Sequence, residues 1–300
     1  MAPIWLMAGP TASGKSAVAL ELAKATGGEI VNADSMQLYA DLRVLTARPT
    51  AEEEAQAPHH LFGVARAEEA WSVGRWLAAA LESLTAVAAR GRPAIVVGGT
   101  GLYFRALTMG LAAIPPVPAA VREAIRADFE RSGEATFRER LAGVDPAAEA
   151  RIAPGDRQRL TRAAEVFAAS GRPLTDWQAA TSPTVAADAW SGVVVTVARD
   201  QLYRRIEARL DAMVAAGALA EVERLLARAL DPVLPAMKAL GVASFARQLT
   251  GQLGPDEALA EAKAETRRYA KRQITWFNRQ CPDWPRAAAD AEQVQRGLAG

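Results

Sequence analysis

The sequence has few of the residues that build disulfides or metal sites. Cys281 is the single cysteine among 300 residues, which excludes an internal disulfide and a multi-cysteine zinc site. The two histidines, His59 and His60, are neighbours in the chain, and adjacent side chains suit a metal poorly. We expect them to serve in a loop or in packing, so the chemistry must rest on other residue types.

A strong net charge and a long apolar run are also lacking. Lys and Arg number 35 against 34 Asp and Glu, for a net charge of +1, so any binding of nucleic acid must depend on a local basic patch. No run of 18 apolar residues occurs, and the N-terminal segment lacks the basic region of a signal peptide. We therefore expect a cytoplasmic protein with no membrane association.

The most informative segment that is present is GPTASGKS. It fits the phosphate-loop pattern G-x-x-x-x-G-K-[ST], with a short apolar run before it and an Ala/Leu-rich helical pattern after it. In such a loop the backbone N–H groups and the helix dipole hold an anion, the lysine adds a positive charge, and the last hydroxyl can bind Mg²⁺. Binding of a diphosphate or nucleotide is assigned to Gly9, Pro10, Thr11, Ala12, Ser13, Gly14, Lys15 and Ser16.

Short apolar runs alternate with helical patterns along much of the chain. This alternation is typical of an α/β fold, here a P-loop NTPase-like parallel sheet flanked by helices. The predicted strands are Ile4–Ala8, Glu29–Ala33, Ala94–Val97 and Val193–Ala198.

One stretch interrupts the alternation. A proline-rich connector at 114–118 opens it, and three helical patterns follow without a strand-like run. We predict an all-helical insert at 113–186 between two parts of the core, 1–112 and 187–285. The second part ends in a helical, basic C-terminal region, and 286–300 is predicted to be a loose tail.

Ligands of an open parallel sheet bind where its strands end, and four candidate side chains follow such ends. Asp34 is a general base, a Mg²⁺ ligand or a cap on the next turn. Thr100, between glycines, contacts phosphate or the nucleophile, or caps the following helix. Arg205 and Arg209 lie one helical turn apart and are candidates to clamp a diphosphate.

Two segments combine the features of an RNA-binding surface. One, 157–162, is rich in arginine, and the other, 263–279, holds six Lys or Arg residues against the single acid Glu265. Tyr269, Trp276 and Phe277 are interleaved with these charges, a pattern that favours phosphate contacts with base stacking. The alternative is a solvated helix face whose aromatic residues lie in the core.

Taken together, the motifs resemble one family, the tRNA dimethylallyltransferases, also called tRNA isopentenyltransferases or IPP transferases. The resemblance runs from the phosphate loop to Trp276, with Gly155 and Val242 departing from the family pattern. The matching segments are GPTASGKS (9–16), ADSMQLY (33–39), TARP (46–49), VGGTGLY (97–103), DRQRLTRAAEV (156–166), LYRRIEARL (202–210), KALGV (238–242) and RRYAKRQITWF (267–277).

The resemblance implies a prenyl transfer to RNA. A dimethylallyl group would pass from dimethylallyl diphosphate, held by the phosphate loop, to N6 of adenosine 37 in tRNA, with Mg²⁺ assisting and Ser16 as its possible ligand. It implies that Asp34 is the general base, and that Thr100 and Arg209 complete the catalytic set. We expect the enzyme to act as a monomer.

The resemblance also implies which residues contact tRNA. They fall near the strand ends, in the insert and on the C-terminal helix, and the insert would contact the anticodon stem-loop. The residues are Asp34, Ser35, Met36, Gln37, Thr100, Arg122, Gln158, Arg159, Leu160, Thr161, Arg162, Lys271, Arg272, Gln273, Ile274, Thr275, Trp276, Phe277 and Asn278.

Two other functions are compatible with part of the sequence. A P-loop small-molecule kinase explains the phosphate loop and the parallel sheet, but not the basic helix and the arginine-rich insert. A non-enzymatic RNA-binding module leaves the phosphate loop and Asp34 without a role.

Overall fold

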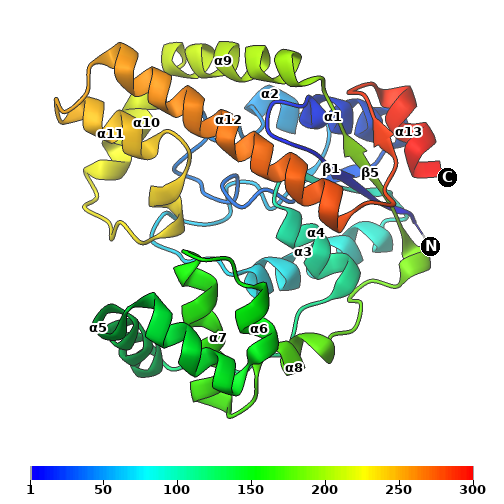
Figure 1. Ribbon diagram of the computed structural model, residues 1–300. Coiled ribbons are helices and arrows are strands. Elements are labelled where there is room, and N and C mark those ends of the chain that lie inside the picture. Colours follow the sequence, from blue (N-terminus) through cyan, green and yellow to red (C-terminus); the bar gives the residue numbers. More distant parts are fainter. Residues whose placement is uncertain (1, 300) are drawn as a thin grey trace. The chain divides into compact units, whose positions relative to one another are not determined.

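A parallel β-sheet organises the larger part of the chain (Figure 1). The structure is a computed structural model and describes residues 2–299. Its strands lie in the order β3-β2-β4-β1-β5-β6, and the neighbouring strands are parallel. The predicted α/β class is therefore confirmed. The strands are β1 (Ile4–Ala8), β2 (Glu29–Asn32), β3 (His59–His60), β4 (Ala94–Gly98), β5 (Trp190–Val195) and β6 (Arg286–Ala287).

The observed strands β1, β2, β4 and β5 overlap the four predicted strands and differ from them only at their ends. The strand predicted at 193–198 is β5, which starts earlier, at Trp190, and ends at Val195. Pairing with β1 explains the early start, because Ile4 lies opposite Trp190 in the register of the two strands. The edge strands β3 and β6 were not predicted, since two residues carry no periodic pattern.

The chain divides into two compact units. One unit, here called the core unit, combines the residues up to 108 with those from 185 onward and contains the sheet. The other, called the insert unit, spans Met109–Thr184. The helices of the core unit are α1 (Lys15–Thr26), α2 (Ala51–Glu54), α3 (Val73–Ala89), α4 (Gly101–Met109), α9 (Arg199–Ala215), α10 (Ala218–Leu226), α11 (Val242–Leu249), α12 (Pro255–Gln280) and α13 (Ala291–Ala299), with 3-10 turns at Ala187–Ala189 and Pro235–Lys238.

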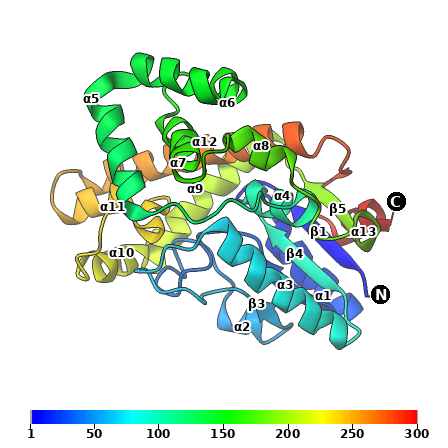
Figure 2. The same ribbon diagram turned by 90° about the horizontal axis from the view of Figure 1, so that it is seen from below.

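Helices cover both faces of the sheet (Figure 2). On one face, α1 and α13 pack on the strands through Met7, Leu22, Ile95 and other buried apolar residues. On the opposite face, the Trp76 ring of α3 stacks on Tyr103 of α4 with centroids 3.9 Å apart. The Trp76 indole N–H also donates a hydrogen bond to the backbone oxygen of Asn32, at 2.9 Å, so α3 is tied to β2 as well as packed on it.

The segment predicted as a loose tail is instead part of the core unit. β6 pairs with β5, and Thr196 donates its backbone N–H to the Ala287 oxygen at 2.8 Å. In α13, Val294 and Leu298 are buried against the sheet. The prediction was wrong because a short Ala-rich segment shows few apolar residues, while these two, four positions apart, suffice to bury one helix face.

Helices α9 and α12 lie side by side (Figure 1). Leu202, Ile206 and Leu210 of α9 pack against Ala270 of α12. Ion pairs flank this apolar seam: Lys263 with Asp211 at 2.5 Å, and Arg267 with Glu207 at 2.8 Å. Two of the six basic residues in the C-terminal segment therefore serve helix packing.

The secondary structure of the insert unit is helical throughout. Gly133 has a positive φ of 73° and breaks α5 into two segments. The buried Asp145 links two of the helices, because its carboxylate caps α6 at the Ala148 N–H and accepts from the Thr175 hydroxyl at 2.7 Å. The helices are α5 (Ala119–Val144), α6 (Pro146–Arg151), α7 (Arg157–Ser170) and α8 (Leu174–Ala179).

Across residues 2–299, no helix combines the length and the apolar content that a membrane crossing requires.

Candidate active site

The phosphate loop lies between β1 and α1, as its motif requires. Two of its residues adopt left-handed backbone conformations, Ala12 with φ 61° and Gly14 with φ 95°. Gly9 passes so close to β5 that a Cβ on it would lie 2.8 Å from the Val195 oxygen. Gly9 and Gly14 therefore stand where a side chain would clash or strain the backbone, and α1 follows directly on the loop. Two of the loop N–H groups have partners within the protein, because Thr11 donates to the Gln273 side chain at 2.8 Å and Ser13 to the Pro10 oxygen at 3.2 Å.

Lys15 is a buried cation next to this loop. Its ammonium donates to the Pro10 oxygen at 3.2 Å, and its side chain is almost completely buried. Burial lowers the pKa of Lys15 to about 8; the negative charge of Asp34 acts in the opposite direction, and the positive charge of Arg209 lowers it further. The structure thus brings together three residues that are far apart in the sequence.

Arg209 and Arg205 face the phosphate loop from α9. Burial lowers the pKa of the Arg209 guanidinium, while the charges of Asp34 and Glu53 raise it. Arg205 donates to the Ser13 backbone oxygen at 3.1 Å, so it supports the loop itself. Of the two arginines, Arg209 is the one that lines the adjacent cavity.

A cavity of about 650 Å³ opens beside the phosphate loop. Lys15, Ser16 and Arg209 line it beside the loop. The segment 43–53 forms part of its wall and adds further charged side chains: Arg43, Arg48, Glu52 and Glu53. Its apolar lining comes from Ala17, Leu20, Ile30, Phe62 and Val97. The lining therefore combines charged and apolar side chains.

The ends of β2 and β4 meet in a hydrogen-bonded junction. The Thr100 Oγ1 accepts the Ser35 backbone N–H at 2.9 Å, and the Thr100 N–H donates to the Ala33 oxygen at 3.1 Å. Gly98 makes this possible, because a Cβ there would lie 2.1 Å from the Ala33 backbone. One oxygen of Asp34 accepts the Met36 N–H at 3.0 Å, so the proposed base also shapes its own turn.

Tyr269 of α12 reaches the same junction. Its hydroxyl lies near the side chains of Thr100 and Gln273, which both act to lower its pKa. Burial raises the pKa of Tyr269, and the negative charge of Asp34 raises it further, so the phenol stays protonated. Tyr269 is therefore a polar member of the site that can donate a hydrogen bond.

The inner face of α12 is buried against the loops of the site. Gln273 and Phe277 are almost fully buried, and the Trp276 ring covers Gly101, where a Cβ would lie 2.2 Å from it. Phe277 also makes an edge contact with Phe104. Gln273, Trp276 and Phe277 were predicted to contact tRNA. Gln273 and Phe277 are instead buried in the core unit and Trp276 is partly buried there, so the aromatic residues agree with the alternative that places them in the core.

The outer face of α12 is exposed and basic. Lys271, Arg272, Thr275 and Asn278 are solvent-exposed, whereas Ile274 packs toward α9. The Arg272 guanidinium lies over the Tyr269 ring, 5.6 Å from its centroid. Of the residues predicted to contact tRNA on this helix, these four are the ones on its exposed face.

The segment that carries Gln37 is anchored at many points. The Gln37 amide donates to the backbone oxygens of Thr46, at 3.0 Å, and Ala47, at 2.9 Å. On α10, the buried Glu221 carboxylate accepts three backbone N–H groups in a row, from residues 43–45, at 2.8 to 2.9 Å. Nothing in the sequence pattern marked Glu221, because its partners lie more than 170 positions away.

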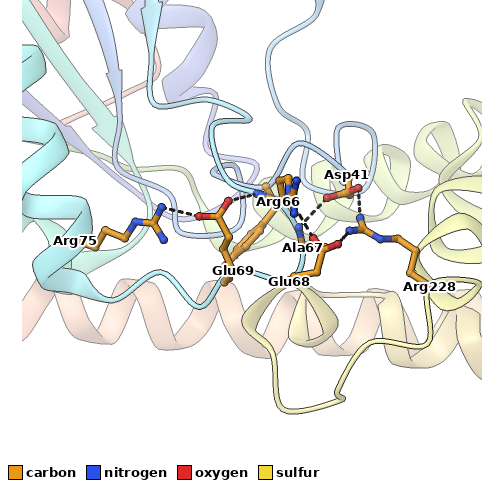
Figure 3. Close-up of polar contacts among 8 residues, drawn as sticks. Asp41, Arg66, Ala67, Glu68, Glu69, Arg75 and Arg228 are labelled. Atoms are coloured by element: carbon orange, nitrogen blue, oxygen red, sulfur yellow. Dashed lines mark hydrogen bonds and ion pairs between the residues drawn. The ribbon is translucent and has the colours of Figure 1, made fainter. Parts of the chain in front are cut away.

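A second contact, just after α10, holds the same segment at Asp41 (Figure 3). The Arg228 guanidinium, just after the helix, pairs with Asp41 at 2.5 Å and with Glu68. Asp41 in turn accepts the Ala67 N–H at 2.9 Å. Together with Glu221, Arg228 fixes the chain that forms one wall of the cavity.

In the insert unit, the predicted RNA-contacting segment has two faces. Leu160 is fully buried in the helical core and Thr161 is nearly so, so their predicted tRNA contacts do not fit this structure. Gln158 and Arg159 are exposed, and Arg162 is partly so. Arg122 donates to the Val117 oxygen at 3.0 Å, within the same unit.

Few side chains in the described part of the chain are placed to bind a metal ion together. Within residues 2–299, no group of three or more His, Cys, Asp or Glu side chains is placed to hold a metal ion. His60 instead lies 2.7 Å from the buried carboxylate of Glu29, and the His59 ring contacts Phe62. Both histidines lie in the edge strand β3, where His60 contacts a carboxylate and His59 a neighbouring ring.

Comparison with known proteins identifies the family of the chain. The sequence model of the family described as IPP transferase matches residues 37–280, and that described as isopentenyl transferase matches residues 2–62. A tRNA dimethylallyltransferase of Phenylobacterium zucineum is 63% identical over 97% of this chain and 94% of its own length. One from Caulobacter sp. is 60% identical over 94% and 92%, respectively.

A solved structure agrees with the sequence comparisons. The crystal structure of a full-length tRNA isopentenylpyrophosphate transferase from Bacillus halodurans is 31% identical, with a TM-score of 0.69, over 99% of this chain and 94% of that one. These likenesses extend over both the core unit and the insert unit. The chain belongs to the IPP transferase family.

Proposed function

We propose that this protein transfers a dimethylallyl group from dimethylallyl diphosphate to N6 of adenosine 37 in tRNA, releasing diphosphate. Close relatives are named tRNA dimethylallyltransferase, which supports the reaction class. The observation that carries the proposal is the cluster at the phosphate loop. There the carboxylate of Asp34 lies close enough to the cations of Lys15 and Arg209 to shift the pKa of both.

The donor half of the reaction needs a cradle for a leaving diphosphate. As the bond from carbon to oxygen breaks, negative charge grows on the diphosphate oxygens, where the loop N–H groups, Lys15 and Arg209 stabilise it. The lowered pKa of Lys15 reflects the cost of its burial without an anion, a cost that a bound diphosphate offsets. The apolar part of the cavity leaves room for a C5 chain.

The acceptor half needs a group that takes the proton from N6. Asp34 and Thr100 lie at the same junction of strand ends, and Asp34 is the carboxylate there. We assign Asp34 as the general base and Thr100 as a group that orients N6. Because N6 of adenine lies inside the stack of the anticodon loop, the base must be turned out to reach them, with Ser35, Met36 and Gln37 beside it.

Exposed basic and polar residues would hold the rest of the tRNA. On the core unit these are Lys271, Arg272, Thr275 and Asn278, and on the insert unit Arg122, Gln158, Arg159 and Arg162. Guanidinium and ammonium groups bind phosphate oxygens, and such contacts position the tRNA without recognising its bases.

We propose that the protein works as a monomer in the cytoplasm, where tRNA is found.

Magnesium fits the site through a single protein ligand. The exposed Ser16 hydroxyl lines the cavity next to Lys15, in the position where the motif places a Mg²⁺ ligand. Mg²⁺ commonly completes its shell with phosphate oxygens and water, so the lack of an acidic cluster within residues 2–299 agrees with this mode of binding. When bound, the ion would help to neutralise the departing diphosphate.

The proposal is tested by transfer of a labelled prenyl group. We expect label from dimethylallyl diphosphate to reach unmodified tRNA, and not a transcript in which adenosine 37 is replaced. Asp34→Asn keeps the oxygen that accepts the Met36 N–H but removes the base, so its kcat should fall by about 10²–10⁴-fold.

The same assay contains the outcomes that contradict the proposal. Phosphoryl transfer from labelled ATP to a small molecule, with no prenyl transfer, would show a P-loop kinase instead. Near-normal turnover by the Asp34→Asn enzyme would remove Asp34 from the base role while leaving the reaction intact.

A further inference from the structure

Gln273 connects two loops that belong to opposite halves of the site. Its side-chain oxygen accepts the backbone N–H of Thr11 in the phosphate loop at 2.8 Å. Its side-chain N–H group donates to the backbone oxygen of Gly99, next to Thr100, at 2.9 Å. The Gln273 amide thus joins the phosphate loop to the loop that contains Gly99 and Thr100, here called the acceptor loop. The Gln273 side chain is almost fully buried.

The space around this amide is closely filled. A Cβ on Gly99 would lie 2.1 Å from the Gln273 nitrogen, so the glycine is required for the loop to approach the amide. Tyr269, one helical turn earlier on α12, places its hydroxyl near the side chains of Gln273 and Thr100. Trp276, one turn later, covers Gly101. The inner face of α12 therefore follows the acceptor loop over two turns, with Gln273 at the centre.

Gln273 also contacts the phosphate loop at its most strained point. Ala12, which follows Thr11, has a φ of 61°, a conformation that residues other than glycine rarely adopt. Two contacts from elsewhere in the chain flank it, Gln273 on the Thr11 N–H and Arg205 on the Ser13 oxygen. Strain of this kind persists only where the surroundings hold it, and here they hold a loop shaped for an anion.

We propose that Gln273 is a positioning residue that sets the distance between the diphosphate cradle and the Asp34–Thr100 pair. The inference rests on the proposed function, in which the prenyl carbon lies between these two groups. A misplacement of about 1 Å can cost about 10²-fold in rate, so an amide that fixes both loops affects the chemical step without touching either substrate.

Two substitutions separate the roles of the amide. Gln273→Met keeps the length of the side chain but removes both hydrogen bonds. Gln273→Glu keeps an acceptor for Thr11 and places a second oxygen against that of Gly99, so the bond to the acceptor loop is lost. The matched control is Gln280→Met, the same exchange at an exposed position of the same helix.

For Gln273→Met we expect kcat to fall about 10- to 100-fold and the KM for dimethylallyl diphosphate to rise about tenfold, with the KM for tRNA changed less than twofold. Direct binding of inorganic diphosphate, measured by calorimetry, should weaken along with the donor KM. Gln273→Glu should lose as much kcat, and Gln280→Met should match the wild type. If the methionine variant does not fold, as judged by circular dichroism, the glutamate variant decides the matter.

Two outcomes would overturn the inference. One is a kcat and a donor KM within twofold of the wild type in both variants. The other is an equal rise in the KM for tRNA and for the donor, which indicates a general loss of structure. If the wild-type enzyme transfers no prenyl group, the proposed function fails, and the diphosphate titration still tests the effect of Gln273 on the loop.

Discussion

At the scale of single residues, the site depends on charges that are held out of water. Lys15 is a buried ammonium whose pKa lies near 8, and Asp34 offsets only part of the effect of burial. Such a group binds an anion tightly while it is protonated, because the anion replaces the missing solvation. The charge of Lys15 should therefore change with pH near its pKa of about 8.

The affinity for dimethylallyl diphosphate should therefore depend on pH through Lys15. A bound anion raises the pKa of Lys15, so binding takes up a proton once the pH exceeds about 8, the pKa of the free site. The Kd should be nearly constant below pH 8 and should then rise, by up to about tenfold per pH unit, toward pH 9.5. The donor itself contributes little, because a phosphate group with a second pKa of about 6 is already ionised there.

Lys15→Arg provides the control for this titration, because its guanidinium stays charged up to about pH 12. Its Kd for the donor should be weaker but flat from pH 7 to 9.5. A wild-type Kd that is also flat over this range would show that the lysine is not the titrating group.

The sequence located some of these residues and not others. Asp34 and Thr100 were found because parallel strands end at one edge of the sheet, a rule that needs no side-chain detail. Gln273 was assigned to tRNA because the family resemblance implies that the segment 271–278 contacts tRNA, although its position on the helix turns it inward. Glu221 gave no signal at all, since its three N–H partners belong to a distant loop.

At the scale of elements, α12 has two functions on its two faces. Thr266, Ala270, Gln273 and Phe277 recur at three- and four-residue intervals and are all buried. Lys271 and Arg272 lie on the exposed face between them. The helix could be predicted from this periodicity, but the division between core aromatics and solvent-facing cations requires the packing partners, Gly101 and Phe104, to be known.

Removal of the two exposed cations should weaken tRNA binding through its electrostatic part. For the double variant Lys271→Ala/Arg272→Ala, the slope of log K against log salt should become shallower by about 1 to 2, the loss expected for two phosphate contacts. Filter binding of tRNA measures this slope. A salt range of about 50 to 300 mM spans the screening at physiological ionic strength.

Lys24→Ala/Arg66→Ala is the matched control, because it removes the same charge from exposed positions of the core unit outside α12. Its slope should remain close to that of the wild type. Equal slopes for both double variants would assign the cations of α12 to a solvated face without RNA contacts.

At the scale of the whole molecule, the parallel sheet and the position of the helical insert follow from patterns along the chain, whereas the order of the strands was not predicted. Alternating strands and helices predicted the parallel sheet, and the interruption near 113–186 corresponds to the unit observed at Met109–Thr184. The edges of the sheet were less accessible to prediction. Strands β3 and β6 contain two residues each and are defined by pairing with β2 and β5, not by their own composition.

One edge of the sheet is held by a buried carboxylate. Glu29 opens β2 and is almost fully buried, with Arg90 at 2.6 Å, Arg92 at 3.3 Å and the His60 ring at 2.7 Å. Hydrogen bonds from Arg90 lower the pKa of Glu29 to about 2, and those from His60 act in the same direction against the effect of burial. A single side chain thus connects β2, β3 and the end of α3.

Acid should therefore destabilise the core unit through Glu29. Its pKa is lower in the folded chain than the ordinary 4.5, so the stabilisation is complete above about pH 4.5 and is lost as the pH falls toward 2. Glu29→Gln should lower the free energy of unfolding at pH 7 by about 2 kcal/mol, less than the full shift implies because Arg90 and Arg92 are partly exposed. It should also flatten the dependence on pH between 4.5 and 2.

Urea unfolding followed by tryptophan fluorescence, at intervals from pH 7 to 3, measures both effects. The exposed Glu21→Gln is the control for the loss of one negative charge, which matters because the net charge of +1 rises toward that of 35 cations as the carboxylates protonate. If Glu29→Gln and Glu21→Gln lose stability in parallel on acidification, general charge repulsion governs the acid limb. A limb that is flattened only in Glu29→Gln assigns it to the carboxylate at the edge of the sheet.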